Sequence, residues 1–273
     1  MFNWNVDEER FKKEDPKGYR LWRLTQLINY GLSEGEKLDK KEVIKAWPMI
    51  KENIDPYTPK QNQFLGYIQA ESEINKWFYL TGGTALSEFY LKHRLSEDID
   101  LFSHSQVNDI FIDGFLKKIS PKLRISNIKK DHIMGLFIYK LVYSDGESLK
   151  IDFNEFEFPQ VELNNVKLGN LAVDSFYDIA INKLYTILGR FQTRDFIDLY
   201  FILKKKEFIL EQLISRTEEK FNTKVDMLYL SSQLLRVVDL PKSFPKMLKP
   251  FKFGKMVDYF KKEAKRLGEK GML

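Results

Sequence analysis

The sequence predicts an α+β protein with a mixed β-sheet core flanked by helical regions at both ends. Three observations predict it: apolar residues recur at helical spacing in the first and last thirds, short β-rich runs fill the middle, and 43% of the 273 residues are hydrophobic, enough for a buried core. We expect an N-terminal helical accessory region over 1–70, a sheet-containing core over 71–172, and a C-terminal helical region over 173–273 that completes the functional site.

Two amphipathic helices are expected in the N-terminal region, over residues 20–32 and 40–54. Asp39 precedes the second of them and Glu42 follows three residues later. This spacing is typical of an N-cap residue with a capping box.

A strand, a glycine turn and a helix open the central region. The β-rich run 76–80 ends at Thr81, Gly82 and Gly83, and residues 84–92 then carry apolar side chains at helical spacing. Four further strands are expected, at 98–102, 123–128, 136–143 and 149–156.

Helical spacing returns in the last third of the chain. Asp174 or Ser175 can cap a helix that ends near Gly189, and Thr193 can cap the next one, which carries apolar residues on one face. Three prolines, at 241, 245 and 250, then break the chain into short pieces.

The charge is uneven along the chain. The net charge is +5, and between Lys242 and Lys270 ten Lys or Arg stand against three Asp or Glu. A basic segment can bind nucleic acid by releasing counterions from phosphates. An amphipathic helix with a solvated lysine face explains the same residues equally simply, and both readings stay open.

Composition excludes several classes of protein. Without cysteine there is no disulfide scaffold and no thiolate metal site. The polar start has no signal-like apolar core, and no apolar run approaches the ~18 residues of a membrane span. We expect a soluble cytoplasmic protein that does not enter a membrane.

Three aspartates are the first candidates for chemistry. Residues two apart on a strand face the same side, so Asp98 and Asp100 in DIDLF point together, and Asp152 in LKIDF faces away from the core. If the two strands are neighbours, the three carboxylates meet and can hold Mg²⁺ or Mn²⁺ for phosphoryl or nucleotidyl transfer. A solvated acidic edge strand is the simpler explanation of a DxD pair taken alone.

The turn at Gly82, Gly83 and Thr84 is a candidate phosphate site. Glycines let the backbone approach a phosphate, and the following helix N-terminus presents free N–H groups. Thr84 can cap that helix or contact a phosphate oxygen. A tight strand-to-helix turn, however, needs glycines whether or not it binds a ligand.

The C-terminal helices supply further charges. Lys183 is a natural point charge for a triphosphate, and Arg190 lies two turns beyond it. Asp195 and Asp198 share a helix face that we expect to lie opposite the apolar face. An intrahelical pair between Arg194 and Asp198 on the surface is the alternative interpretation.

Four stretches follow one another in this sequence: GGTAL, HRLSEDIDLF, KIDF and DIAINKLYTILGRFQTRDFIDLYFIL. Together and in this order, they resemble the AbiEii/AbiGii family of bacterial abortive-infection toxins. The resemblance covers roughly residues 70–205. It implies a minimal nucleotidyltransferase with a polymerase-β-like core, in which a hydroxyl attacks the α-phosphate of a nucleoside triphosphate. The acceptor it implies is the 3′ end of tRNA, and the setting is a type IV toxin–antitoxin system whose cognate antitoxin acts indirectly.

The resemblance also assigns residues to roles. Asp98, Asp100 and Asp152 correspond to the metal-binding and catalytic carboxylates, and Lys183 with Asp195 or Asp198 to the later catalytic motifs. The predicted nucleotide-binding residues are Gly82, Gly83, Thr84, Lys183, Arg190 and Arg194. Two other functions remain open: a nucleotide-binding protein without catalysis, and an AMP- or UMP-transferase that modifies protein. His93, just before DIDLF, is expected to lie on the surface.

Overall fold

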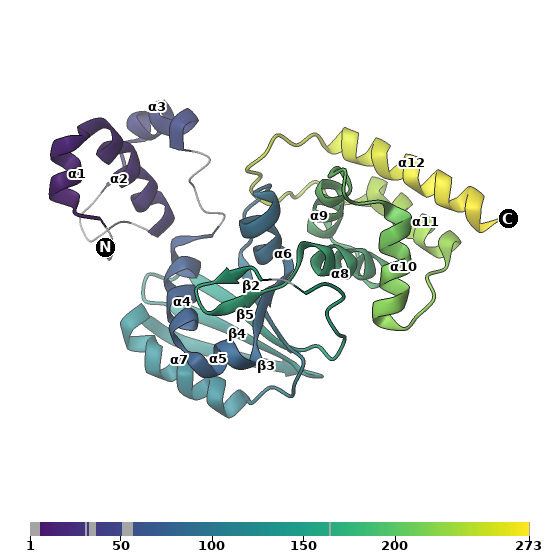
Figure 1. Ribbon diagram of the computed structural model, residues 1–273, viewed down its shortest axis with the longest axis horizontal. Helices are drawn as coiled ribbons and strands as arrows, with labels where there is room; N and C mark the ends of the chain where they lie inside the picture. Colours follow the sequence, from purple (N-terminus) through teal and green to yellow (C-terminus); the bar gives the residue numbers. More distant parts are fainter. Residues whose placement is uncertain (1–5, 31, 33–36, 51–56, 164, 273) are drawn as a thin grey trace.

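The computed structural model describes residues 6–30, 32, 37–50, 57–163 and 165–272, and it confirms the α+β prediction (Figure 1). A seven-stranded sheet has the order β3-β4-β5-β2-β1-β7-β6. Two pairs, β2 with β5 and β1 with β7, are parallel, and the others are antiparallel. The strands are β1 (Tyr79–Thr81), β2 (Asp98–Ser103), β3 (Ile125–Ile133), β4 (Leu136–Tyr143), β5 (Ser148–Glu155), β6 (Lys167–Leu168) and β7 (Leu171–Val173).

Three N-terminal helices form a group of their own, α1 (Glu8–Glu14), α2 (Pro16–Tyr30) and α3 (Lys40–Ile50) (Figure 1). Leu24, Ala46 and Ile50 make a small core between α2 and α3. The carboxylate of Asp39 accepts from the backbone N–H of Lys41, as expected of a cap. Residues 51–54 of the predicted second helix lie outside the described residues.

Helices α4 (Pro59–Ala70), α5 (Ser72–Trp77) and α7 (Asp109–Leu123) lie along the sheet (Figure 1). The alternate residues Ile99 and Leu101 of β2 and Ile151 of β5 are fully buried in the main core, with Phe64 from α4. The other alternate set, which carries the aspartates, is only half-buried. One face of the sheet is therefore closed by helices and the other carries the candidate site.

The strand-to-helix turn differs from the prediction. Residues 76 and 77 end α5, so only the last part of the predicted strand 76–80 is extended. Helix α6 (Gly82–Ala85) passes directly into a π-helix, η2 (Leu86–Leu91), which stops at Lys92 in the left-handed region with φ 45°. Neither α4 nor α7 was predicted as an individual helix from the sequence.

The C-terminal region is helical, as predicted: α8 (Phe176–Gly189), α9 (Thr193–Leu203), α10 (Leu210–Phe221), α11 (Met227–Leu235), the 3₁₀ helix η3 (Arg236–Asp239) and α12 (Phe253–Gly271). Ser175 caps α8, accepting from the N–H of Asp178. The predicted cap at Thr193 is wrong, because α9 begins one residue earlier with Gln192 as N-cap. The Thr193 hydroxyl instead donates to the carbonyl oxygen of Pro241.

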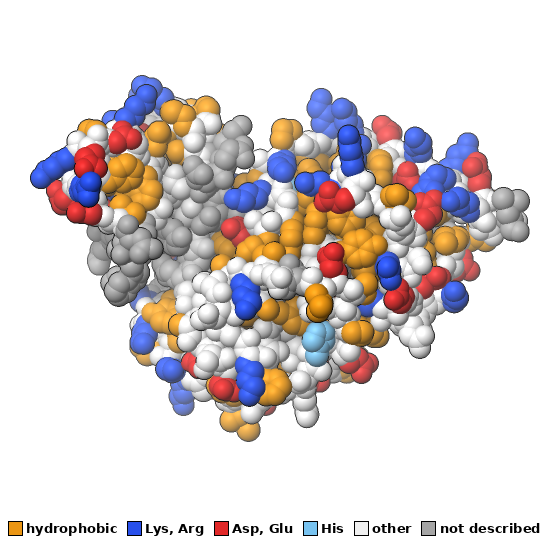
Figure 2. Space-filling view, in the orientation of Figure 1, with side chains coloured by type: hydrophobic (Ala, Val, Ile, Leu, Met, Phe, Trp, Pro, Cys, Tyr) orange, Lys and Arg blue, Asp and Glu red, His pale blue; other side chains and the backbone are white. Residues whose placement is uncertain are grey.

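The basic C-terminal segment contains the amphipathic helix. Helix α12 buries one stripe, Met256, Phe260, Ala264 and Leu267, and exposes most of its lysines. Figure 2 shows basic side chains over α12 interspersed with acidic ones. Among the described helices, none combines the length and apolar character that crossing a membrane requires.

Candidate active site

The three predicted aspartates meet at the centre of the sheet. Strand β5 is the neighbour of β2, which was the condition for the three carboxylates to meet, and the pairing is parallel. The register places Asp152 directly opposite Asp100 and Lys150 opposite Asp98. All four side chains leave the sheet on the same face, because residues in register on neighbouring strands share a face.

Burial and mutual repulsion make this carboxylate group reluctant to ionise. Desolvation, the charge of Asp152 and that of Asp98 raise the pKa of Asp100 to about 6. Desolvation also raises the pKa of Asp152, although its hydrogen bond with Lys150 opposes the shift. A divalent cation would reverse both effects by favouring the charged forms.

Oxygens without partners make the group suitable for a hard cation. Oδ1 of Asp152 is buried without a hydrogen bond, and no side chain or backbone group of the described chain donates to Asp100. Lys150 and Arg194 hold the other oxygens: Lys150 pairs with Asp152, and Arg194 Nη1 lies 3.1 Å from Asp98 Oδ2. The described residues contain no preassembled group of three or more metal ligands.

The glycine turn lies against the carboxylates. Gly82 has φ +70°, a conformation that side chains rarely adopt, and a Cβ there would overlap Oδ2 of Asp100. A Cβ on Gly83 would lie 2.5 Å from Nη2 of Arg94. The contacts at both positions therefore favour glycine, and the start of α6 approaches the carboxylates closely.

Thr84 does not take the place predicted for it. Its side chain is fully buried, and the hydroxyl donates to the backbone carbonyl oxygen of Asp98. Gln61 of α4 donates to the carbonyl oxygens of Ser96 and Asp98. Thr84 and Gln61 thus fix the start of β2, and the Thr84 hydroxyl is used within the fold instead of facing a phosphate.

A second, fully buried charge cluster is built around Asp198. Arg94 Nε and Nη2 donate to the two carboxylate oxygens of Asp198 at 2.7 and 2.8 Å, and Lys183 Nζ lies 2.7 Å from Oδ2. Burial disfavours the charge of Asp198, but Arg94 and Lys183 outweigh it and hold the pKa of this carboxyl well below its ordinary value. His93 is also buried, with Nε2 2.8 Å from Oδ1, and burial lowers its pKa.

Asp195 extends this cluster toward the solvent. Its two oxygens accept from Arg190 Nε and Nη2 at 2.9 and 2.8 Å, and Lys183 Nζ lies 3.2 Å from Oδ1. Burial raises the pKa of Asp195, but the charges of Lys183 and Arg190 outweigh burial and leave this pKa below its ordinary value. Lys183 therefore bridges two carboxylates that fix its position.

Three expectations about this cluster are wrong. Asp195 and Asp198 are fully buried instead of lying on an exposed helix face, because α9 packs between α8 and η2 as well as against α12. His93 is buried and not on the surface. Arg194 pairs with Asp98 on β2, and Asp198 pairs with Arg94, so the intrahelical alternative does not apply.

A cavity of about 300 Å³ joins the two groups. Its wall includes both glycines, the three aspartates, Lys183, Arg190 and Arg194. Thr84, Asp195 and Asp198 lie behind the wall. The cavity thus presents both carboxylates and cations to a ligand, an arrangement suited to a phosphorylated ligand with a bound cation.

Asn182 and Lys150 line this cavity but had no assigned role in the sequence analysis. Both polar atoms of the Asn182 side chain are buried without a hydrogen bond, one residue before Lys183 on α8. An unpaired buried amide is costly and is a natural contact for a polar ligand. Lys150 could have been identified from its strand position, two residues before Asp152 on the same face.

Most of this sequence matches a known protein family. The AbiEii family, described as "Nucleotidyl transferase AbiEii toxin, Type IV TA system", matches residues 64–262. An uncharacterized protein of Aquifex aeolicus (strain VF5) is 27% identical over 192 residues, which cover 69% of this chain and 86% of that protein.

Solved structures similar to part of this chain include JHP933 from Helicobacter pylori, at 22% identity and a TM-score of 0.47, covering 77% of this chain and 94% of that one. MenT4, a nucleotidyltransferase toxin from Mycobacterium tuberculosis H37Rv, has 16% identity and a TM-score of 0.46, covering 71% of this chain and 76% of that one. The family match covers more than half of the sequence and includes every predicted site residue. The chain belongs to the AbiEii family of nucleotidyl transferase toxins.

Proposed function

We propose that this protein transfers a nucleoside monophosphate from a nucleoside triphosphate to a hydroxyl acceptor, with Mg²⁺ or Mn²⁺, and that the acceptor is the 3′ end of tRNA. The observation that carries the proposal is the register of Asp100 with Asp152 beside Asp98, directly under the Gly82 turn. Family membership supports the transferase class and a cognate antitoxin that acts indirectly. We expect this activity in the cytoplasm.

Asp98, Asp100 and Asp152 would hold the divalent cation. When bound, the cation neutralises the phosphate charge and lowers the pKa of the attacking hydroxyl. The acceptor oxygen forms a bond to the α-phosphorus, the bond from that phosphorus to the bridging oxygen breaks, and pyrophosphate leaves with the electron pair. The hydroxyl proton passes to the carboxylate group or to solvent.

Lys183 and Arg190 would bind the phosphates. Both line the cavity, and their positions are fixed by Asp195 and Asp198, which do not line it. The two aspartates are therefore positioning residues in this proposal. Arg194 is paired with Asp98 in the structure, and it would be available to phosphate if a cation replaced it on that carboxylate.

Asn182 gives the cavity a neutral polar contact. Its amide has one group that donates and one that accepts, both without a partner. We assign it to the ribose or base of the nucleotide.

The test is transfer of label from each of the four α-³²P NTPs, with Mg²⁺ or Mn²⁺, to total tRNA and to total cell protein. An Asp98→Ala/Asp100→Ala protein is the control. Label on tRNA that disappears in the control would support the proposal. Label on protein alone would make the enzyme a protein AMP- or UMP-transferase, and NTP binding without any transfer would leave a nucleotide-binding protein.

A further inference from the structure

Three lysines form a straight row across the sheet, ending at the carboxylates. The strand registers place Lys129 of β3 opposite Lys140 of β4, Lys140 opposite Lys150 of β5, and Lys150 opposite Asp98 of β2. Neighbouring strands lie ~4.8 Å apart, so the row spans ~10 Å from the edge of the sheet to the site.

The row lies on the open face of the sheet. Lys129 and Lys140 are exposed, and Leu136 and Ile138 of the same face line the cavity. Lys130, on the other face of the sheet, is paired: it turns toward α7 and forms ion pairs with Asp109 and Asp113.

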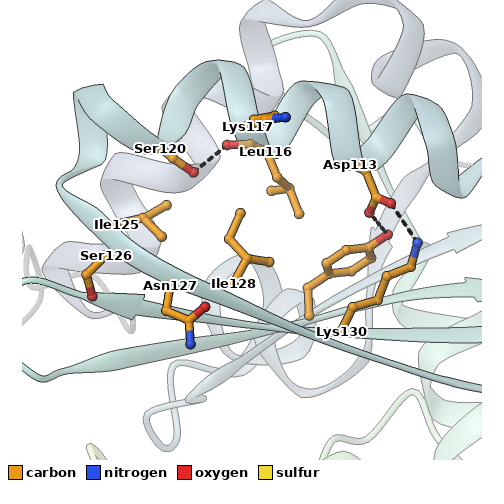
Figure 3. A pocket seen from close by; sticks show the side chains of 10 residues that line it. Asp113, Leu116, Lys117, Ser120, Ile125, Ser126, Asn127, Ile128 and Lys130 are labelled. Carbon is orange, nitrogen blue, oxygen red and sulfur yellow. Dashed lines mark hydrogen bonds and ion pairs between the residues drawn. The ribbon is translucent and has the colours of Figure 1, made fainter.

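Figure 3 shows the opposite, closed face. Lys130 and the Tyr139 hydroxyl both reach Asp113, while Leu116 of α7 and Ile128 of β3 face the hollow, of about 470 Å³, between helix and strands. The charge of Lys130 on that face is thus paired within the fold. The unpaired charge is on the face of the active site.

The row of lysines destabilises the folded protein, so folding alone does not explain it. Like charges directly opposite each other on neighbouring strands are destabilising. In the part of the chain that the structure describes, neither Lys129 nor Lys140 forms an ion pair, although Asp131 lies on the same face opposite Ile138. Lysines protect exposed edge strands from aggregation, but of the three strands that carry the row only β3 is at an edge of the sheet, and β4 and β5 are interior.

We infer that the lysine row binds the phosphodiester backbone of an RNA acceptor and guides its terminal hydroxyl to the carboxylates. This inference rests on the proposed function. A polynucleotide carries one negative charge per nucleotide in a regular series, which matches lysines repeated at each strand. The row continues into the cavity at Lys150, so a strand that follows it brings its end to Asp98 and Asp100.

The test compares the wild type with Lys129→Ala/Lys140→Ala. The double variant should raise the KM for tRNA about five- to tenfold and leave kcat at saturating tRNA unchanged, because lysine–phosphate contacts contribute to binding and not to the reacting geometry. The slope of log KM against log salt should fall by up to about two. Lys261→Ala/Lys262→Ala, which removes the same charge from exposed positions on α12, is the matched control.

Binding of a short fluorescent single-stranded RNA, followed by anisotropy without NTP, separates this inference from the proposed function. RNA binding that weakens only in the row variant supports the row even if no transfer occurs. If the wild type and the row variant had equal KM for tRNA and equal RNA affinity, the lysine-row inference would be wrong, although the proposed transfer activity would still hold. The same loss in the α12 control, no RNA binding by the wild type, or row-dependent labelling of protein alone would also overturn it.

Discussion

Arg94 and Asp198 form a buried bidentate ion pair, with hydrogen bonds of 2.7 and 2.8 Å between planar groups. The two residues are 104 positions apart in the sequence, just before β2 and within α9. This contact joins the sheet to the C-terminal helices at the base of the cavity. It also explains how Lys183 is held at the cavity wall, since Lys183 shares Asp198 with Arg94.

Replacing Asp198 by Asn should strongly destabilise the protein. The substitution leaves Arg94 and Lys183 buried with less negative charge, and breaking a buried pair in this way costs about 3–5 kcal/mol. Urea unfolding followed by circular dichroism measures the change in the free energy of unfolding. Asp258→Asn, at an exposed position on α12, should change it by less than about 0.5 kcal/mol. A similar small effect at Asp198 would contradict the structural role.

The stability of the wild type should fall with acidity through the same carboxyl. The pKa of Asp198 is lower in the folded than in the unfolded protein, so its contribution is fully present above about pH 4 and is lost as the pH falls below that value. The slope of unfolding free energy against pH should therefore be positive in this range. Wild type and Asp198→Asn, compared from pH 6 downward, should converge; parallel curves would argue against a lowered pKa.

Asp100→Asn should abolish nucleotide transfer and stabilise the metal-free protein. Burial and the neighbouring carboxylates raise the pKa of Asp100 to about 6, so its ionisation costs stability as the pH rises from about 4 through 6. Above pH 6, removing the charge should stabilise the protein by about 1–3 kcal/mol. Thermal unfolding in EDTA at pH 7.5 measures this effect, and a lower Tm for the variant would contradict it. Added Mg²⁺ should stabilise the wild type more than the variant.

Sequence patterns predicted the sheet side of the site better than the helical side. Alternation on a strand fixes which side chains share a face, so Asp98 could be grouped with Asp100, and Asp152 placed on the side away from the core, before their strands were paired. The burial of Asp198 and His93 could not be found in this way, because helical periodicity identifies one apolar face and α9 is covered on several. Asp198 meets His93 and Arg94 from about a hundred positions away in the sequence, and single-sequence patterns do not report such contacts.

Gly82→Ala should reduce transfer severely, because the added Cβ meets Asp100 as well as straining a left-handed backbone. Gly146→Ala separates these effects: Gly146 has φ +84° but nothing within 4 Å of the added Cβ. Both variants should lose about 1–2 kcal/mol of stability from backbone strain. Only Gly82→Ala should lower kcat/KM by an order of magnitude or more. Equal kinetic losses in the two proteins would indicate that the strain alone matters.

Asn182→Leu should stabilise the protein while weakening its use of NTP. The wild-type amide is buried without partners, and replacing it by an apolar side chain of similar size removes a desolvation cost of about 1–3 kcal/mol. The same change removes the contact that we assign to the ribose or base, so the KM for NTP should rise by about tenfold. Thermal unfolding without ligand gives the first quantity and NTP titration of the transfer rate gives the second. Thr186→Val, one helical turn further along the same cavity wall, is the control; its hydroxyl is already bonded to the carbonyl oxygen of Asn182, so it should change the KM much less. A higher Tm with an unchanged KM would show that the unpaired amide is not a nucleotide contact.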